Sequence, residues 1–388
     1  MNAISRDSLT TPAYVYDLSA VKRALESARA LYEGTGYQVL YSLKACSLRP
    51  LLELIAEQAD GFAVSSFFEA KLAREVLANQ GDVHFTSTGL TKRDVGPICE
   101  TVDYLSFNSL GQFEQFSDVM NGGPKQGLRI NPRLSFVSDD RLDPCRQHSK
   151  LGIPFDAALD AFGDRRIRDN VSGIHLHTNC ESCDLSELSL TVQRILPVLE
   201  AADGCLRWIN LGGGYMFSEA NNTEAFVQAI ETLCQRFGVK VFVEPGASIV
   251  RDAGLLVSSV IDLFESDGKS IAVLDTTVSH APELFEFQFE PRVIGEQENG
   301  RHRYILAGCS CLAGDLFGEH GFDRPLSIGS RVVFAEMGAY TVTKAQMFNG
   351  INLPAIYLQS NGEEPELVRE FTYEDFVTRH GVRTNACI

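Results

Sequence analysis

The sequence has no long apolar run. None of its segments approaches the roughly 18 consecutive apolar residues that a membrane-spanning helix needs. The first residues, MNAISRDSLTTPAYVYD, also lack the apolar segment of a secretory signal. We therefore expect no membrane partner and a location in the cytoplasm.

Basic residues are in short supply. The chain has 34 lysines and arginines against 51 aspartates and glutamates, which gives a formal net charge of −17. This balance disfavours nucleic acid as a partner and suits a cationic small-molecule ligand.

Paired metal-ligand motifs are also missing. The ten cysteines are scattered, and the single CxxC motif, Cys180 to Cys183, has no second pair to complete a zinc site. We expect reduced thiols and no bound metal.

From Gln38 onward, short apolar strands alternate with amphipathic helical segments. Strands are expected at 38–43, 61–65, 82–86, 103–107, 127–131, 171–178, 206–211 and 240–244. Eight such βα units within about 210 residues are typical of a barrel and not of an open, doubly wound sheet. We predict the α/β class, with a (β/α)8 TIM-type barrel over residues 20–254.

Beyond residue 254 the pattern changes to strands separated by Gly, Pro, Asn and Asp turns. Strands are expected at 255–264, 270–278, 302–308 and 331–337. We predict a second, mainly antiparallel β domain over residues 255–388, which residues 1–19 join through a strand at 12–18. The irregular segment 132–154 is expected to be an active-site lid.

The carboxyl ends of the barrel strands carry candidate site residues. Active sites of such barrels form at these strand ends. The set comprises Lys44, His177, Glu244 and the glycine run Gly212, Gly213 and Gly214. An amine, an imidazole, a carboxylate and a glycine-rich loop together suit the cofactor pyridoxal 5′-phosphate. Each feature alone has a plain structural explanation, and the strand pattern places His175 and His177 on the same face, so it does not choose between them.

Each of these groups has a predicted role. The Lys44 amine would hold the cofactor covalently, and the Glu244 carboxylate would accept the pyridinium N–H. His177 would stack on the ring. The absence of a Cβ at Gly212 to Gly214 would let backbone amides approach the phosphate.

The second domain supplies two further candidates, Cys311 in GCSCLAGD and Tyr340 in EMGAYTVTKAQMFNGI. Cys311 is either an inert loop cysteine or a proton donor to a substrate carbanion. Tyr340 is either a buried aromatic residue with a bonded hydroxyl or a hydroxyl donor to the cofactor phosphate.

Together these motifs resemble the fold-type III pyridoxal-phosphate decarboxylases, whose barrel and β domain are similar to those of alanine racemase. YSLKA resembles the cofactor-lysine motif, HLHTNCES the histidine motif, NLGGGY the phosphate loop and EPGAS the carboxylate motif. The resemblance favours His177 over His175. It also implies catalytic roles for Lys44 and Cys311, a phosphate contact for Tyr340, and a head-to-tail homodimer in which Cys311 reaches the Lys44 of the other subunit.

Departures from the family pattern bear on the substrate. Ala247 and Leu312 stand where diaminopimelate decarboxylases carry an arginine and a glutamate, and Ala63 stands where ornithine decarboxylases carry an acid. The resemblance then implies decarboxylation of carboxynorspermidine or carboxyspermidine to norspermidine or spermidine. The alternatives are another basic amino-acid decarboxylase of this fold, or a cofactor-binding protein without turnover.

A polyamine substrate needs carboxylates for its ammonium groups. Besides Glu244, the substrate-binding candidates are Asp275, His280 and Glu283 in the segment 274–287, and Asp315 in CLAGD. Each acid could equally be a solvated surface group or a turn cap.

Overall fold

The computed structural model describes residues 9–31, 36–78 and 80–381. The chain divides into two compact units. We call residues 22–249 the barrel unit and residues 1–21 with 250–388 the β unit.

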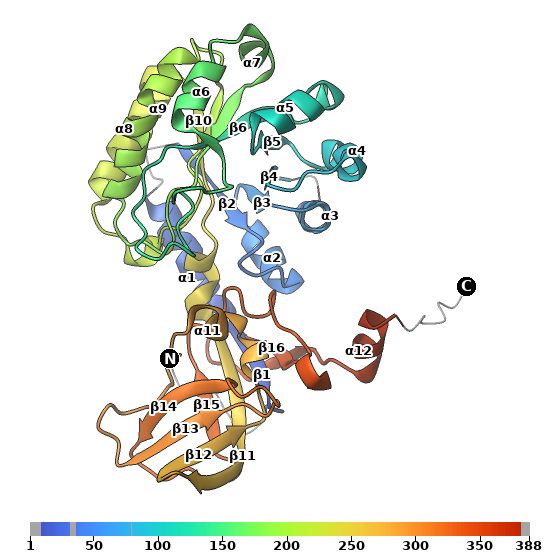
Figure 1. The fold of residues 1–388 in the computed structure, drawn as a ribbon, viewed down its shortest axis with the longest axis vertical. Coiled ribbons are helices and arrows are strands. Elements are labelled where there is room, and N and C mark those ends of the chain that lie inside the picture. Colours follow the sequence, from blue (N-terminus) through green and yellow to red (C-terminus); the bar gives the residue numbers. More distant parts are fainter. Residues whose placement is uncertain (1–8, 32–35, 79, 382–388) are drawn as a thin grey trace. The chain divides into compact units, whose positions relative to one another are not determined.

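The barrel unit is built on eight parallel strands that close on themselves (Figure 1). They are β2 (Tyr37–Ser42), β3 (Gly61–Val64), β4 (Asp82–Ser87), β5 (Tyr104–Phe107), β6 (Lys125–Asn131), β8 (Gly173–His175), β9 (Trp208–Asn210) and β10 (Lys240–Val243). The pairings of β10 with β2 and of β5 with β6 complete the ring. Every predicted barrel strand is present, and the predicted fold class is confirmed.

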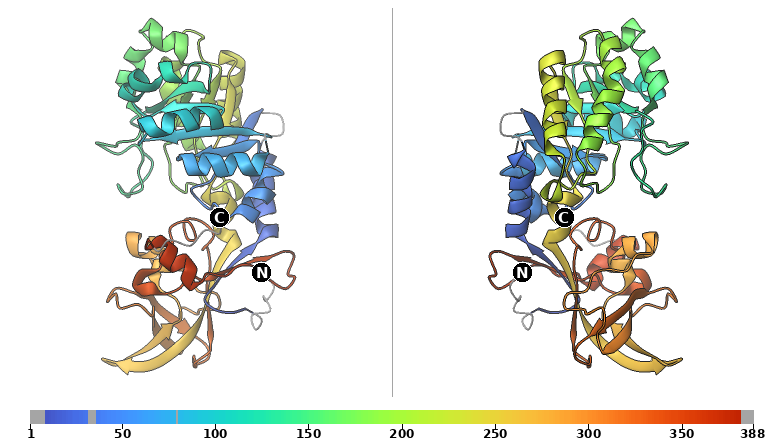
Figure 2. Two further views of the ribbon diagram at one scale, coloured as in Figure 1. Left: turned by 90° about the vertical axis from the view of Figure 1, so that its right-hand side faces the viewer. Right: turned by 90° about the vertical axis from the view of Figure 1, so that its left-hand side faces the viewer.

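Helices follow the strands and lie around them in the views of Figure 2. They are α1 (Leu18–Ala30), α2 (Arg49–Ala56), α3 (Phe67–Leu77), α4 (Lys92–Thr101), α5 (Leu110–Phe116), α6 (Phe155–Ala161), α7 (Arg165–Asn170), α8 (Ser186–Ala201), α9 (Thr223–Phe237) and α10 (Ala247–Val250). A short strand, β7 (Ile153–Pro154), pairs with β6.

The start of α3 illustrates how side chains fix the turns at the carboxyl ends of the strands. Ser66 accepts a hydrogen bond from the Glu69 amide at 3.2 Å, and the Glu69 carboxylate accepts one from the Ser65 amide at 2.7 Å. This reciprocal capping fixes the turn that follows β3.

The only tryptophan of the sequence packs inside the barrel. Trp208 is buried beside Leu40, Tyr104 and Phe242. A Cβ added at Gly173 would lie 2.0 Å from its indole ring. A glycine on the neighbouring strand therefore makes room for the largest side chain in the core.

The β unit contains a mixed sheet in which antiparallel pairs predominate. Its strands are β1 (Ala13–Asp17), β11 (Gly254–Ser266), β12 (Lys269–Leu274), β13 (His302–Ala307), β14 (Leu316–Phe322), β15 (Arg331–Phe334), β16 (Ala355–Gln359) and β17 (Glu366–Arg369), and its helices are α11 (Pro282–Phe287) and α12 (Tyr373–Arg379). β1, from near the N-terminus, pairs with β11 and β16.

The sequence interpretation missed β14, β16 and β17. β14 reads LFGEHGF, whose two glycines are unfavourable in a strand. β17 is exposed along its whole length, so it has no alternation of apolar and polar residues to detect.

The segment 132–154 is held by buried asparagines at its end. Asn108 Nδ2 donates to the Lys150 carbonyl at 2.8 Å, and Asn131 Nδ2 donates to the Leu151 carbonyl at 3.1 Å. These bonds anchor the end of the segment. Its role as a lid stays a prediction.

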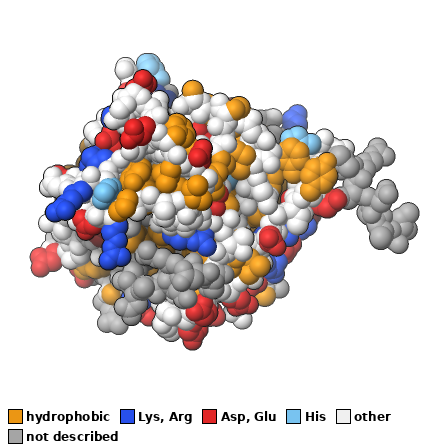
Figure 3. Space-filling view, turned by 90° about the horizontal axis from the view of Figure 1, so that it is seen from below, with side chains coloured by type: hydrophobic (Ala, Val, Ile, Leu, Met, Phe, Trp, Pro, Cys, Tyr) orange, Lys and Arg blue, Asp and Glu red, His pale blue; other side chains and the backbone are white. Residues whose placement is uncertain are grey.

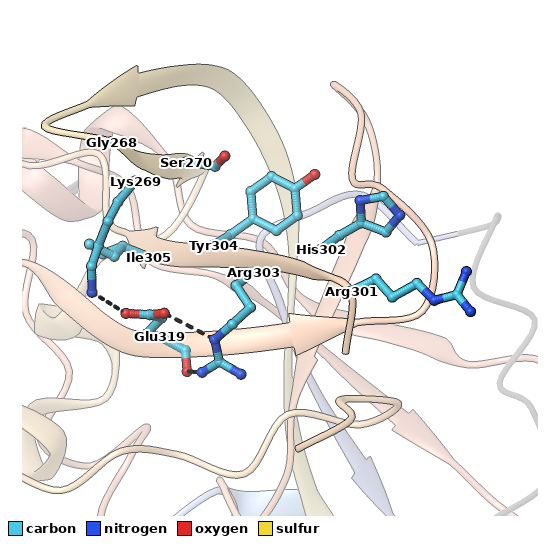
Figure 4. A pocket seen from close by; sticks show the side chains of 9 residues that line it. All are labelled: Gly268, Lys269, Ser270, Arg301, His302, Arg303, Tyr304, Ile305 and Glu319. Carbon is cyan, nitrogen blue, oxygen red and sulfur yellow. Dashed lines mark hydrogen bonds and ion pairs between the residues drawn. The ribbon is translucent and has the colours of Figure 1, made fainter. Parts of the chain in front are cut away.

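A polar groove lies on the sheet of the β unit (Figure 4). Lys269 and Arg303 both bind the Glu319 carboxylate within it, the latter at 3.0 Å. Because Glu319 offsets part of their charge, these two cations do not form a concentrated anion site.

Candidate active site

A pocket opens at the carboxyl ends of the barrel strands. Ten residues line it: Ser42, Lys44, Ala63, Val64, Ser65, Thr86, Arg129, His175, His177 and Glu244. Lys44, His177 and Glu244, which lie far apart in the sequence, are therefore brought together as their positions at the strand ends predicted.

Lys44 follows β2 in a tight turn, in which the Ala45 amide donates to the Ser42 carbonyl at 3.2 Å. The Lys44 side chain is exposed in the open pocket, yet many protein atoms lie around its amine. Burial lowers the pKa of Lys44 below its ordinary value of 10.5, Arg129 lowers it further, and Glu244 opposes the shift. A larger fraction of neutral, nucleophilic amine results at neutral pH.

The Glu244 carboxylate is buried and well supplied with donors. Asn210 Nδ2 donates to Oε1 at 2.7 Å, and His175 Nε2 lies 3.3 Å from Oε2. Burial alone would raise the pKa of Glu244, but the contact with His175 and the neighbouring His177 together hold it well below its usual range. Glu244 is therefore an anion that can accept further hydrogen bonds.

The two histidines occupy the same pocket and have different partners. His175 faces Glu244, whereas His177 Nδ1 accepts a hydrogen bond from the Gly213 amide at 3.1 Å. Burial lowers the pKa of both imidazoles, and nearby Lys44 lowers that of His177 further. His177 is thus a neutral ring whose orientation is set by the glycine run.

The glycines of this run allow close approach of neighbouring backbone. A Cβ at Gly212 would lie 2.2 Å from the Leu176 carbonyl oxygen, and one at Gly214 would lie 2.1 Å from that of Asn179. Both positions also have positive φ angles of 72° and 91°. The Gly212 amide donates to Asn210 Oδ1 at 2.9 Å, so the amides of Gly212 and Gly213 are both engaged within the protein.

Arg129 and Asn210 are site residues to which the sequence interpretation gave no role. Arg129 lies in β6, two residues before the strand ends at Asn131, and lines the pocket, where its charge acts on Lys44 and Glu244. Its position near the carboxyl end of a predicted barrel strand was the available signal. Asn210 stands two residues before Gly212, and only its three-dimensional contacts distinguish it.

Cys311 and Tyr340 lie in loops of the β unit. The Cys311 side chain is exposed, and its amide donates to Asn349 Oδ1 at 3.0 Å. Tyr340 is partly buried and has a φ of 55°, an uncommon value for a bulky residue. Strained backbone of this kind often occurs at functional sites.

The acidic candidates of the β unit all have partners within the chain. Asp275 accepts the Ser259 amide at 2.8 Å, and Glu283 lies 3.2 Å from the Lys344 ammonium. Asp315 is buried and accepts the amides of Val278 at 2.7 Å and Ser310 at 3.0 Å. These last contacts give Asp315 a loop-anchoring role.

His280, the remaining candidate, is fully buried in the short 3-10 helix Val278–His280. Its Nδ1 lies 2.9 Å from the Thr276 hydroxyl, and its Nε2 has no hydrogen-bond partner. Burial lowers the pKa of His280 to about 4, so its imidazole is neutral at neutral pH.

Within the described ranges no group of three or more His, Cys, Asp and Glu side chains is placed to hold a metal ion. Over the same residues, no helix is both long and apolar enough to cross a membrane.

The pocket fits pyridoxal 5′-phosphate by the chemistry of its side chains: an amine with a lowered pKa, a buried anion and a neutral imidazole. Residues 18–251 match the family described as pyridoxal-dependent decarboxylase, pyridoxal binding domain. The chain belongs to this family and is a decarboxylase that depends on pyridoxal phosphate. The resemblance and the cofactor predicted from the motifs are confirmed.

Two relatives and one solved structure are similar to this chain over nearly its whole length. The chain is 34% identical to the carboxynorspermidine/carboxyspermidine decarboxylase of Herminiimonas arsenicoxydans, over 95% of this chain and 99% of the relative. It is 33% identical to the carboxyaminopropylagmatine decarboxylase of a Synechocystis species, over 96% of each chain. The crystal structure of the carboxynorspermidine decarboxylase from Campylobacter jejuni, complexed with norspermidine, is similar with a TM-score of 0.86 and 28% identity, covering 96% of this chain and 100% of that one.

Proposed function

We propose that this enzyme removes the α-carboxylate of a carboxylated polyamine, with carboxynorspermidine and carboxyspermidine as the preferred substrates. The observation that carries the proposal is the full-length similarity to decarboxylases of such compounds. The acidic balance of the chain suits a cationic substrate.

The barrel unit is proposed to be the cofactor-binding domain, within the predicted boundaries 20–254. Lys44 would hold the cofactor through its amine, Glu244 would accept the pyridinium N–H, and His177 would stack on the ring. Because the Gly212 and Gly213 amides are engaged in the protein, a contact from the run to the phosphate would come from Gly214, with Tyr340 as a further donor. When bound, pyridoxal 5′-phosphate supplies an electron sink for the charge left at Cα after carbon dioxide departs.

Cys311 is proposed to return a proton to the Cα atom of the substrate. Its thiol is exposed on a loop, so it is accessible to a reacting group. Asp315 accepts hydrogen bonds from the Ser310 amide of this loop and from the Val278 amide of the segment after β12, and we assign it a positioning role in place of direct substrate contact.

The polyamine tail is proposed to bind the acidic pair on α11. Glu283 and Glu286 both bind the ammonium of Lys344, and their side chains remain 30% and 44% accessible. A substrate ammonium would bind these accessible carboxylates in competition with the ammonium of Lys344.

The active enzyme is proposed to be a homodimer. Large apolar side chains are exposed on the β unit, and hydrophobic side chains gather on the face shown in Figure 3. The exposed apolar side chains of the β unit include Phe264, Phe289 and Leu316, with exposed fractions of 49%, 50% and 50%. Exposed apolar surface of this kind commonly marks a protein interface.

The location is proposed to be the cytoplasm. None of the nine cysteines among the described residues forms a disulfide, which suits a reducing compartment.

A substrate panel tests the proposed function. Carbon dioxide release is measured with carboxynorspermidine, carboxyspermidine, carboxyaminopropylagmatine, ornithine, arginine, lysine and diaminopimelate. We expect the highest kcat/KM with the first two compounds. A higher value with diaminopimelate, ornithine, arginine or lysine would overturn the polyamine assignment, and turnover of none would leave only a cofactor-binding protein.

A further inference from the structure

The side chain of Asn210 joins two parts of the pocket. It is 1% exposed and ends β9. Its Nδ2 donates to Glu244 Oε1 at 2.7 Å, while its Oδ1 accepts the Gly212 amide at 2.9 Å. One amide group therefore contacts both the buried carboxylate and the glycine turn.

His84 holds this amide in one orientation. Its Nδ1 lies 3.3 Å from Asn210 Nδ2, within the barrel interior. The ring stacks on Tyr104 with centroids 4.1 Å apart and also contacts Phe242 at 4.3 Å. Burial lowers the pKa of His84 well below its usual value, so the imidazole is neutral and can accept the second N–H of Asn210.

The contacts continue from the glycine turn to the stacking histidine. The Gly212 carbonyl accepts the Glu244 amide at 2.7 Å, and the Gly213 amide donates to His177 Nδ1 at 3.1 Å. Glu244, Asn210, the glycine turn and His177 thus form one connected hydrogen-bond network. In such a buried network, losing one member leaves its partners unsatisfied.

Building on the proposed function, we propose that Asn210 is a positioning residue that holds the Glu244 carboxylate and the glycine turn in register, so that the pyridine and phosphate ends of the cofactor are recognised together. A side chain that only stabilised the barrel would not link recognition of the pyridine end to recognition of the phosphate end. The dependence of both on Asn210 is therefore the measurable property.

Cofactor binding to the apoprotein separates the two ends without using activity. Three ligands are compared by equilibrium dialysis: pyridoxal 5′-phosphate, pyridoxal without the phosphate, and the 1-deaza analogue without the pyridine nitrogen. The wild-type preference for pyridoxal 5′-phosphate over the deaza analogue reports on Glu244. The preference over pyridoxal reports on the phosphate contacts.

Asn131 provides a matched control. It is also buried. Its Oδ1 accepts a hydrogen bond from the Arg133 amide, two residues onward, at 2.9 Å, and its Nδ2 donates one to the Leu151 carbonyl at 3.1 Å. Asn131→Leu therefore loses equivalent hydrogen bonds without touching Glu244. We expect Asn210→Leu to reduce both preferences by about tenfold or more, and Asn131→Leu to reduce neither.

Asn210→Ser tests the two contacts separately and serves if Asn210→Leu does not fold. A serine hydroxyl can still accept a hydrogen bond from the Gly212 backbone amide. The serine side chain is too short to replace the side-chain amide of Asn210 that reaches Glu244. We expect this variant to lose the preference over the deaza analogue and to keep most of the preference over pyridoxal.

If Asn210→Leu or Asn210→Ser keeps both wild-type preferences, this inference is overturned, and the proposed function is unaffected. An equal loss in Asn131→Leu would overturn it as well, by showing a general loss of stability. A wild-type apoprotein with neither preference would overturn the cofactor roles in the proposed function, and this inference with them.

Discussion

At the carboxyl end of β2, the surroundings of Lys44 control its reactivity. Burial and the positive charge of Arg129 both favour the neutral amine. Only the neutral form attacks a carbonyl carbon, so the site prepares this lysine for covalent chemistry before any substrate arrives.

We predict that covalent attachment of pyridoxal 5′-phosphate to the apoprotein becomes faster with rising pH and reaches its plateau below pH 10.5, the ordinary pKa of lysine. Arg129→Gln removes a positive charge, so the plateau should move to higher pH. The attachment is followed by absorbance, and borohydride reduction with peptide mass spectrometry locates it. Labelling at a lysine other than Lys44 would refute Lys44 as the site of attachment. Lys44→Ala, which should show no covalent attachment, is the negative control.

At the scale of elements, α11 and the loop after β13 divide the acidic residues by their roles. The acids of α11 stay partly exposed, since the Glu283 and Glu286 side chains are 30% and 44% accessible. Asp315, by contrast, is 3% exposed and binds two backbone amides. The partly exposed acids of α11 therefore suit ligand recognition, and the buried Asp315 suits loop anchoring.

For α11 we predict changes of KM in opposite directions. Glu283→Gln should raise the KM for carboxynorspermidine about tenfold, equivalent to about 1.4 kcal/mol, because a substrate ammonium loses a carboxylate. Lys344→Met should lower the KM, because a competing ammonium is removed. Steady-state kinetics measure both.

Asp315→Asn and Asp275→Asn are the controls for this prediction. Asp315→Asn should lower the melting temperature, since it weakens the acceptor of two amides. Asp275 accepts the Ser259 amide, so Asp275→Asn should likewise affect stability more than KM. If Asp315→Asn or Asp275→Asn alone raised the KM, the tail would bind elsewhere in the β unit.

For the whole molecule, the proposed roles of Lys44 and Cys311 depend on assembly. The two residues belong to different units of the chain. The family resemblance implies that they meet across a homodimer.

Mixing two inactive variants tests this arrangement. Lys44→Ala and Cys311→Ala dimers are each expected to be nearly inactive. After subunit exchange, a mixed dimer would carry one doubly substituted and one intact site, so activity should return to about a quarter of the wild-type value. Light scattering verifies the dimer. No recovery despite demonstrated exchange would show that the two residues act within one chain.

The sequence alone determined the barrel and the position of its chemistry. Eight apolar strands with intervening helices close in one way, and parallel strands place their carboxyl ends on one rim, so Lys44, His177 and Glu244 could be assigned to one site from their positions in the pattern. Strand periodicity is a local property, and it therefore survives in the sequence.

Only the tertiary structure decided how the side chains pair. His175 and His177 share one strand face, yet one contacts Glu244 and the other Gly213. Glu283 proved to face Lys344, and Asp315 proved to bind buried amides. These partners lie far apart along the chain, and the register of strands and turns that brings them together depends on the packing of the whole fold.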